Sequence, residues 1–265
     1  MAKFEIKDGV AIIPEGTTEI ENYAFSECAS LENITIPESV TEIGYAAFFR
    51  CVALKSIIIP ESVTKIGEAA FVGCSSLESI VVAEGNPVYD SREGCNAIIE
   101  TKTNILCYGC KSTNIPQSVT KIGGHAFCGC TALERVTIPK SVTEIGNFAF
   151  CDCRLLESIT IPESITKIGN SAFKVCRSLK SITIPESVTE IKNSVFERCI
   201  SLESITFPKS ITEIHAYAFN ECSALSTIYV PAEKTDYYKE LLPEKFHDKI
   251  VELAPEKKTK TEKEC

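Results

Sequence analysis

Apolar and polar residues follow one another along this chain in a pattern that returns every 23 residues. Residues 156–178 read LESITIPESITKIGNSAFKVCRS, and the shared pattern is L-x-x-I-x-I-P-x-S-V-T-x-I-G-x-x-A-F-x-x-C-x-x. Eight copies begin at residues 8, 31, 54, 110, 133, 156, 179 and 202, with Pro at position 7, Thr at position 11 and Phe at position 18 in all of them. Such a fixed period indicates a repeat architecture in which every unit has the same structure.

Each unit predicts a coil made of two short strands and a helical turn. L-x-x-I-x-I alternates apolar and polar residues, as a strand with one buried face does. Proline cannot donate to a strand ladder, so this strand ends at position 7. S-V-T-x-I predicts a second short strand, and A-F-x-x-C predicts a helical turn too short to be stable alone. Because one unit cannot bury its apolar residues, the units are expected to stack around a continuous core.

Cysteine follows the same period. The chain has 14 Cys in 265 residues, and eight of them occupy position 21 of a unit: Cys28, Cys51, Cys74, Cys130, Cys153, Cys176, Cys199 and Cys222. Free cysteine behaves as a small, often buried apolar residue. We therefore predict a buried ladder of free thiols in place of a disulfide framework.

These repeats closely resemble the BspA-type (bacterial surface antigen A) leucine-rich repeat family over about residues 8–230. The resemblance implies an α/β repeat fold, a right-handed solenoid with a parallel sheet along its concave side, short second strands and helical turns. It also implies binding of a protein or an extracellular matrix ligand at the cell surface or in the secreted state.

One unit departs from the pattern. Residues 77–109 begin with a normal strand and continue as AEGNPVYDSREGCNAIIETKTNILCYG, with turn signals at Asn86-Pro87 and Arg92-Glu93-Gly94. The alternating runs 96–100 and 104–108 predict a β-hairpin around Thr101-Lys102-Thr103. This insert either plugs the solenoid as a decorated repeat or projects from it as a binding loop.

The two ends of the repeat array have different patterns. We expect one solenoid domain over 1–253, with an N-terminal cap and first coil in 1–30 and a C-terminal cap in 225–253. The cap sequence PAEKTDYYKELLPEKFHDKIVEL predicts a helix that Pro243 ends and a last strand over 249–253. The tail 254–265 is rich in Lys and Glu, has no apolar core residues, and is expected to be disordered.

The charge balance restricts the class of partner. The formal net charge is −9 and the pI is about 5.1, which argues against nucleic acid and against an anionic membrane as main partners. No apolar run is long enough for a membrane helix, and residues 1–20 lack the pattern of a secretory signal. A cytoplasmic location therefore stands as the alternative to the cell surface, and a monomer is expected.

Candidate catalytic and metal-binding residues are few. His125 and His215 fall at variable positions and are expected to be solvated, and no phosphate loop or nucleophile motif is present. We therefore predict no catalytic residues and no cofactor, with an active site in the insert as the weaker alternative. Four cysteines, Cys107, Cys110, Cys128 and Cys130, have paired spacing that suits zinc. Cys128 and Cys151 lie one unit apart and could instead form a disulfide, but free thiols are favoured over both.

The outward positions 3 and 5 of the first strand carry mainly Ser and Thr. They read Asn33/Thr35, Ser56/Ile58, Ser79/Val81, Arg135/Thr137, Ser158/Thr160, Ser181/Thr183 and Ser204/Thr206. A ladder of this kind either keeps a long sheet soluble or binds a partner. Binding hot spots favour aromatic residues and Arg, so we place the candidate binding patch at Ile58, Val81, Tyr89, Tyr108 and Arg135. The predicted function is a non-enzymatic protein-binding module of the adhesin or host-interaction type, with a cytoplasmic interaction scaffold as the alternative.

Overall fold

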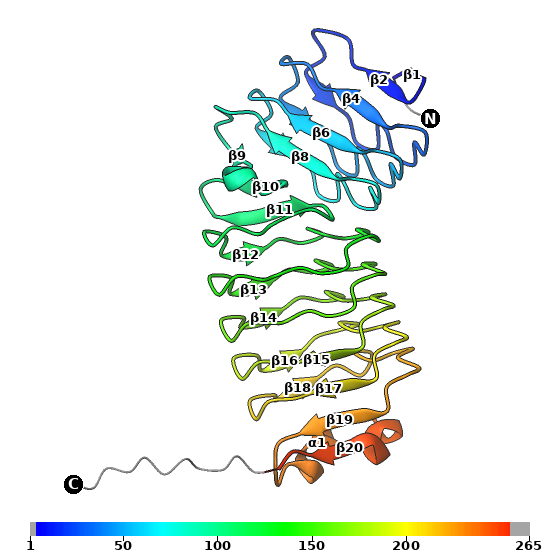
Figure 1. Ribbon diagram of the computed structural model, residues 1–265, viewed down its shortest axis with the longest axis vertical. Helices are drawn as coiled ribbons and strands as arrows, with labels where there is room; N and C mark the ends of the chain where they lie inside the picture. Colours follow the sequence, from blue (N-terminus) through cyan, green and yellow to red (C-terminus); the bar gives the residue numbers. More distant parts are fainter. Residues whose placement is uncertain (1–3, 255–265) are drawn as a thin grey trace, which may run out of the picture.

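The computed structural model describes residues 4–254 and folds them into a β-solenoid of about 11 turns (Figure 1). The coils stack along the long axis of the molecule, with the N-terminal and C-terminal coils at opposite ends. Strands in neighbouring coils pair in parallel and in register, so that residues 23 apart lie side by side. The repeat period and the parallel sheets that the sequence predicts are confirmed.

The first strand of each coil forms one side of the solenoid, which we call the strand face. In the N-terminal half it consists of β2 (Val10–Ile12), β4 (Asn33–Thr35), β6 (Ser56–Ile59) and β8 (Ser79–Val82). In the C-terminal half it consists of β15 (Ser181–Thr183), β17 (Ser204–Thr206), β19 (Thr227–Val230) and β20 (Ile250–Glu252). Between these two groups the described chain keeps only a single bridge, which joins Thr137 to Thr160.

A second side is built from two-residue strands at positions 12 and 13. They are β3 (Glu19–Ile20), β5 (Glu42–Ile43), β7 (Lys65–Ile66), β12 (Lys121–Ile122), β13 (Glu144–Ile145), β14 (Lys167–Ile168), β16 (Glu190–Ile191) and β18 (Glu213–Ile214). The isoleucine faces the core and the charged residue faces water. Oppositely charged neighbours meet there, as Lys65 Nζ and Glu42 Oε1 do at 2.5 Å. Exposed pairs of this kind add little stability.

The third side consists of turns, so the predicted helical turns are wrong. Tyr23 and Glu27 in the first coil both have a left-handed backbone, with φ of 59°. A residue in this region interrupts a right-handed helix. The N–H groups then alternate in direction: Ser26 N donates to Tyr23 O within its own coil, while Phe25 N donates to Ala47 O of the next coil. Hydrogen bonds that alternate in the same way join most neighbouring coils.

The core contains two ladders that run along the stack. The rings of Phe150, Phe173 and Phe196 stack with centroids 5.4 and 5.8 Å apart and are fully buried. Six of the eight repeat cysteines are buried, while Cys28 and Cys130 are only partly so. Each buried thiol donates to the carbonyl of the Phe one coil earlier. These contacts are Cys51 to Phe25, Cys74 to Phe48, Cys153 to Phe127, Cys176 to Phe150, Cys199 to Phe173 and Cys222 to Phe196.

The insert closes the solenoid between its two halves. It contains β9 (Tyr89–Asp90), the 3-10 turn η1 (Arg92–Gly94), β10 (Ala97–Glu100) and β11 (Ile105–Gly109). Strands β10 and β11 form the predicted antiparallel hairpin, and β11 pairs in parallel with β12. Residues 97–99 are fully buried, with Ile98 in the core of the N-terminal half and its neighbours Ala97 and Ile99 in the core of the C-terminal half. The insert is therefore a plug that separates two cores, and the projecting loop is not observed.

Both ends of the stack are covered. At the N-terminal end, β1 (Ile6–Lys7) forms an antiparallel hairpin with β2. At the other end, helix α1 (Thr235–Leu241) and the 3-10 helix η2 (Glu244–Lys249) pack over the last coils, and β20 adds a final parallel strand to β19. The tail predicted to be disordered lies, beyond its first residue, outside the described residues.

Candidate binding surface

The strand face differs between its two halves at position 5. In the four coils from Leu133 to Ala224 this position holds threonine, whereas in the N-terminal half it holds Ile12, Ile58 and Val81 beside a single threonine, Thr35. These three side chains are 74%, 62% and 41% exposed. They point outward because residues alternate across a strand, and the flanking residues at positions 4 and 6, such as Ile57 and Ile59, are buried. The sheet thus presents aliphatic side chains to water without local cover.

Two residues of the predicted patch come together and a third does not. Ile58 and Val81 are directly paired across β6 and β8. Arg135 is exposed, but it lies in the coil that begins at Leu133, and the coil that begins at Cys110 separates it from β8. Ile58 and Val81 therefore form a pair, while Arg135 stands apart from it along the stack.

Tyr89 and Tyr108 do not belong to an exposed patch, so this part of the prediction is wrong. They are only 8% and 7% exposed. The Tyr89 hydroxyl accepts a 3.2 Å hydrogen bond from Ile66 N, and the Tyr108 hydroxyl accepts one of the same length from Ala70 N. Burial raises the pKa of both phenols. In a regular unit the S-V-T-x-I and A-F segments pair with the previous coil. The insert lacks both segments, and this feature of the sequence indicates that side chains of the insert contact the previous coil in their place.

A row of carboxylates borders the aliphatic residues of the N-terminal half. It occupies position 8, one residue after the proline that ends the strand (Ala83 in the insert unit), and consists of Glu15, Glu38, Glu61 and Glu84. We call it the glutamate ladder. All four residues are exposed, and within residues 4–254 none of them forms an ion pair. By contrast, the glutamates at position 2 of the same face are neutralised, Glu32 by Lys55 and Glu78 by Lys111. Sequence analysis did not single out this ladder.

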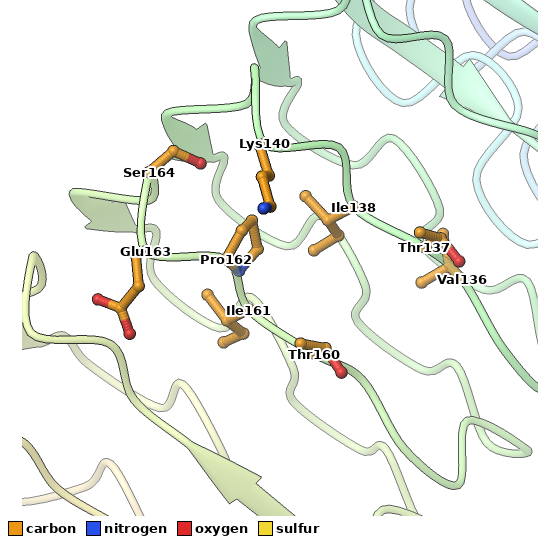
Figure 2. Close-up of a pocket in the computed structure, with 9 residues that line it drawn as sticks. All are labelled: Val136, Thr137, Ile138, Lys140, Thr160, Ile161, Pro162, Glu163 and Ser164. Atoms are coloured by element: carbon orange, nitrogen blue, oxygen red, sulfur yellow. The ribbon is translucent and has the colours of Figure 1, made fainter.

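A groove lies where the strand face is interrupted (Figure 2). It has a volume of about 770 Å³ and is lined by the coils that begin at Leu133 and Leu156. The buried side chains of Ile138 and Ile161 form part of its lining, and Lys140 extends from one coil towards Pro162 of the next. The lining combines four aliphatic residues with three hydroxyl residues, one lysine and one carboxylate, and most of its surface is apolar, which suits contact with an apolar segment better than proton transfer.

Within residues 4–254 the cysteines outside the ladder are free thiols, and the zinc arrangement is not formed. Cys130 Sγ contacts Gly109 O at 3.6 Å and Cys110 Sγ contacts Asn96 O at 3.5 Å, so both thiols are directed at backbone. No group of three or more His, Cys, Asp or Glu within the described chain is arranged to hold a metal ion. Cys128 and Cys151 share a thiol–thiol hydrogen bond, which raises the pKa of Cys128 and lowers that of Cys151.

The two repeat histidines differ in environment. His215 is exposed, as expected. The His125 side chain is only 21% exposed, stacks on the Phe148 ring at 5.0 Å, and places Nδ1 3.5 Å from the Glu68 carboxylate. Burial lowers the pKa of His125 in spite of this carboxylate.

Comparisons with known proteins agree with this architecture. A sequence profile described as "BspA type Leucine rich repeat region" matches residues 9–93 and 97–239 in six copies. The crystal structure of a leucine rich cell surface protein from Faecalibacterium prausnitzii A2-165 is 30% identical over 94% of this chain, with a TM-score of 0.59. This chain spans 60% of the length of that protein. No curated protein matches the chain.

Two further structures share the fold at lower identity. The pneumococcal vaccine antigen PcpA has a TM-score of 0.64 at 21% identity, and the match covers 89% of this chain and 71% of PcpA. A leucine-rich repeat protein from Eubacterium ventriosum ATCC 27560 has a TM-score of 0.56 at 24% identity, covering 83% of this chain and 78% of that one. Among residues 4–254, no helix has the length and apolar character needed to cross a membrane.

Proposed function

Because the chain belongs to the BspA-type leucine-rich repeat family, we propose that it is a non-enzymatic protein-binding module of the adhesin or host/matrix-interaction type. Its strand face is the proposed contact surface, and its ligand is a protein or an extracellular matrix component. The F. prausnitzii relative is described as a cell surface protein, which supports the same location for this chain.

The exposed pair formed by Ile58 and Val81 carries this proposal. Both side chains stand on a rigid sheet, in register, with 62% and 41% of their surface in contact with water. Isolated exposed aliphatic residues need no explanation, but a row of them on a regular surface marks a contact site. Burial of one such side chain contributes about 1.5–3 kcal/mol to an association. Arg135 remains part of the proposed surface as a separate contact further along the stack.

An interaction scaffold inside the cell is the second candidate. The observation that favours it is the set of 13 cysteines that are free in the described residues. Free thiols are typical of reducing compartments. However, eight of these 13 thiols are buried and so protected from oxidants, and the cell surface stays the first candidate.

Site-specific photo-crosslinking tests the proposed contact surface. A photoreactive amino acid placed at Ile58 should capture a protein from host extracellular matrix extract, and the same group at exposed Glu68, on the turn side, should not. The captured protein is then purified and titrated against the parent and the double variant Ile58→Ser/Val81→Ser. We expect the double variant to bind at least about tenfold more weakly. Equal affinity for both forms, with both correctly folded, would exclude this pair as the contact.

A further inference from the structure

Exposed aliphatic side chains continue beyond the central pair towards the N-terminal end. Position 5 places Ile12, Thr35, Ile58 and Val81 in four successive coils, and Val10 adds a 38% exposed side chain beside Ile12. Ile12 pairs with Thr35, and Ile58 pairs with Val81. We call these five residues the N-terminal stripe. At about 4.8 Å per coil the four position 5 residues span about 14 Å.

The glutamate ladder runs parallel to this stripe, three residues further along each coil. Each coil of the N-terminal half thus offers one apolar or methyl-bearing side chain and one unpaired carboxylate, four times in succession. Like charges about 5 Å apart repel one another. A cationic partner would relieve this repulsion, whereas an anionic partner would increase it.

The C-terminal half shows that this combination is not a general feature of the repeat. There, position 8 holds Lys140, Glu163, Glu186 and Lys209, a mixture of charges. The Glu163 carboxylate accepts a 3.1 Å hydrogen bond from Glu186 N, and Glu186 accepts one from Lys209 N. Position 5 is threonine throughout these coils. Compared with these four coils, the N-terminal half therefore has a different surface on the same backbone, one that combines aliphatic side chains with unpaired negative charge.

We propose that the N-terminal stripe and the glutamate ladder together bind an amphipathic, basic α-helix of a partner protein. The apolar face of the helix lies on Ile12, Ile58 and Val81, and its Lys or Arg side chains reach the glutamate ladder. This inference rests on the proposed function, because it names the chemistry of a partner at the same face.

The spacing of the coils fits a helix that lies across the strands. One helical turn rises about 5.4 Å, close to the coil spacing of about 4.8 Å, so successive turns meet successive coils. A helix of about ten residues matches the length of the surface. Side chains on one side of an extended strand repeat every 6.6 Å or so, a poorer match.

Other occupants fit this surface less well. A second copy of the chain would bring one glutamate ladder against another, and like charges across an interface are unfavourable. An anionic membrane would be repelled by the same four carboxylates. A basic helix satisfies both the apolar and the charged halves of the surface.

Synthetic probes test this proposal with the full chain. The first probe is a labelled 16-residue peptide of Leu and Lys at helical spacing. A second peptide carries Glu in place of Lys, and a third carries Ser in place of Leu. A fourth peptide alternates Val and Lys as an extended strand would. Fluorescence anisotropy measures the Kd of each. We expect only the Leu/Lys helix to bind strongly, with an affinity that falls as salt is raised.

Substitutions then locate the site. The triple variant Ile12→Ser/Ile58→Ser/Val81→Ser should weaken binding of the Leu/Lys peptide at least about tenfold. Replacing the four ladder glutamates by Gln should weaken it similarly and remove most of the salt dependence, and replacing them by Lys should transfer the preference to the Leu/Glu peptide. The matched control Glu163→Gln/Glu186→Gln, in the C-terminal half, should leave the Kd within about twofold. Circular dichroism and thermal melting confirm that each variant is folded.

Three results would overturn the proposal. The first is a Leu/Glu or Val/Lys peptide that binds the parent as tightly as the Leu/Lys helix, and the second is an unchanged Kd in the folded triple variant. The third is a C-terminal control variant that weakens binding as much as the substitutions in the glutamate ladder do. The two proposals fail separately. If the Leu/Lys peptide did not displace a partner captured at Ile58, the basic helix would be excluded as the ligand, while the proposed protein-binding function would still hold.

Discussion

The hydroxyl of Tyr108 donates a 2.6 Å hydrogen bond to the carbonyl of Gly67, 41 residues earlier in the chain. The same oxygen accepts a hydrogen bond from Ala70 N. Ala70 N also donates to Gly67 O at 3.3 Å within its own coil, as Ala47 N does to Gly44 O in a regular coil, so the hydroxyl is added beside an existing hydrogen bond. One side chain of the insert therefore binds the main chain of the last coil before the boundary between the two halves.

Removing this hydroxyl should cost stability. In Tyr108→Phe the ring still packs edge-on against Phe71, at 5.2 Å, and Ala70 N keeps its 3.3 Å bond to Gly67 O, but both hydrogen bonds of the hydroxyl are lost. The net contribution of a typical intramolecular hydrogen bond to stability is about 0.5–1.5 kcal/mol. We expect a decrease of this size in the free energy of unfolding, measured by urea denaturation. The matched control Tyr217→Phe, at a tyrosine that is 62% exposed, should change it by less than about 0.5 kcal/mol.

Adjacent residues of β10 should affect opposite halves of the molecule. Ile98 packs into the core of the N-terminal half and Ile99 into that of the C-terminal half, and both are fully buried. Truncation of a buried isoleucine costs about 2–5 kcal/mol. Hydrogen exchange should show faster exchange in β6 and β8 for Ile98→Ala, and faster exchange in β12 and β13 for Ile99→Ala. The same pattern in both variants would mean that the plug does not separate two cores.

The sequence predicts the regular part of the fold because each repeat carries the same information eight times. The strands, the buried Phe and Cys ladders and the plug hairpin follow from alternation and period alone. The third side was predicted as helical because A-F-x-x-C has helical spacing. Sequence gives no sign that positions 16 and 20 have a left-handed backbone, since Tyr23 and Glu27 are residues that rarely adopt it.

The binding surface was only partly predictable for a different reason. Ile58 and Val81 stand out against threonine at the same position, so the period itself identifies them. Tyr89 and Tyr108 were included because aromatic residues are frequent in interfaces, but whether an aromatic side chain points inward depends on tertiary contacts of the insert. Whether the carboxylates of the glutamate ladder form ion pairs likewise depends on the positions of the lysine side chains in the folded protein, which cannot be read from the sequence.

Alkaline pH should destabilise the fold through the cysteine ladder. Burial raises the pKa of the Cys51 and Cys222 thiols to about 12, from an ordinary value of 9.0. Below pH 9 or so both the folded and the unfolded thiols are protonated and the stability is unaffected by them. Between about 9 and about 12 the unfolded chain releases these protons first, so the free energy of unfolding falls, by up to about 1.4 kcal/mol per pH unit for each thiol.

Urea denaturation at several pH values measures this slope. Lysines and tyrosines also titrate in the same range, so the comparison is between the parent and Cys51→Ala. The variant is expected to start from a lower stability and to lose less of it as the pH rises from 9 to 11. Parallel pH profiles for the two proteins would show that the Cys51 thiol is not protected from ionisation in the folded state.

The phenylalanine ladder should be sensitive to a single truncation. Phe173 is fully buried between Phe150 and Phe196, and a buried Phe→Ala change costs about 3–5 kcal/mol. We expect Phe173→Ala to lower the free energy of unfolding by this amount. Leu155→Ala, at a side chain that is 48% exposed, serves as the control and should cost about 1 kcal/mol or less. A loss below about 1 kcal/mol for Phe173→Ala would contradict a tightly packed ladder.

Deletion of residues 77–109 tests whether the insert is needed for the two halves to stack. On the turn side the halves already meet without it, because Gly73 N donates a 3.0 Å hydrogen bond to Cys128 O. Gly129 lies so close there that a Cβ on it would be 2.5 Å from Gly73 Cα, and both glycines have positive φ. The deletion variant would place the coil that begins at Leu54 directly on the one that begins at Cys110.

We expect this variant to fold as a shorter solenoid with a lower Tm. At the new joint, Cys110 stands where a regular unit has Leu and Thr113 stands where it has Ile. The apolar volume that Ile98 and Leu106 now supply would be missing, which leaves an underpacked layer. Deletion of the regular coil 156–178 joins equivalent positions on both sides, so it should lower the Tm less, and differential scanning calorimetry compares the two. If the 77–109 deletion melted at the same temperature as the parent, or higher than the regular-coil deletion, the insert would not support the packing between the halves.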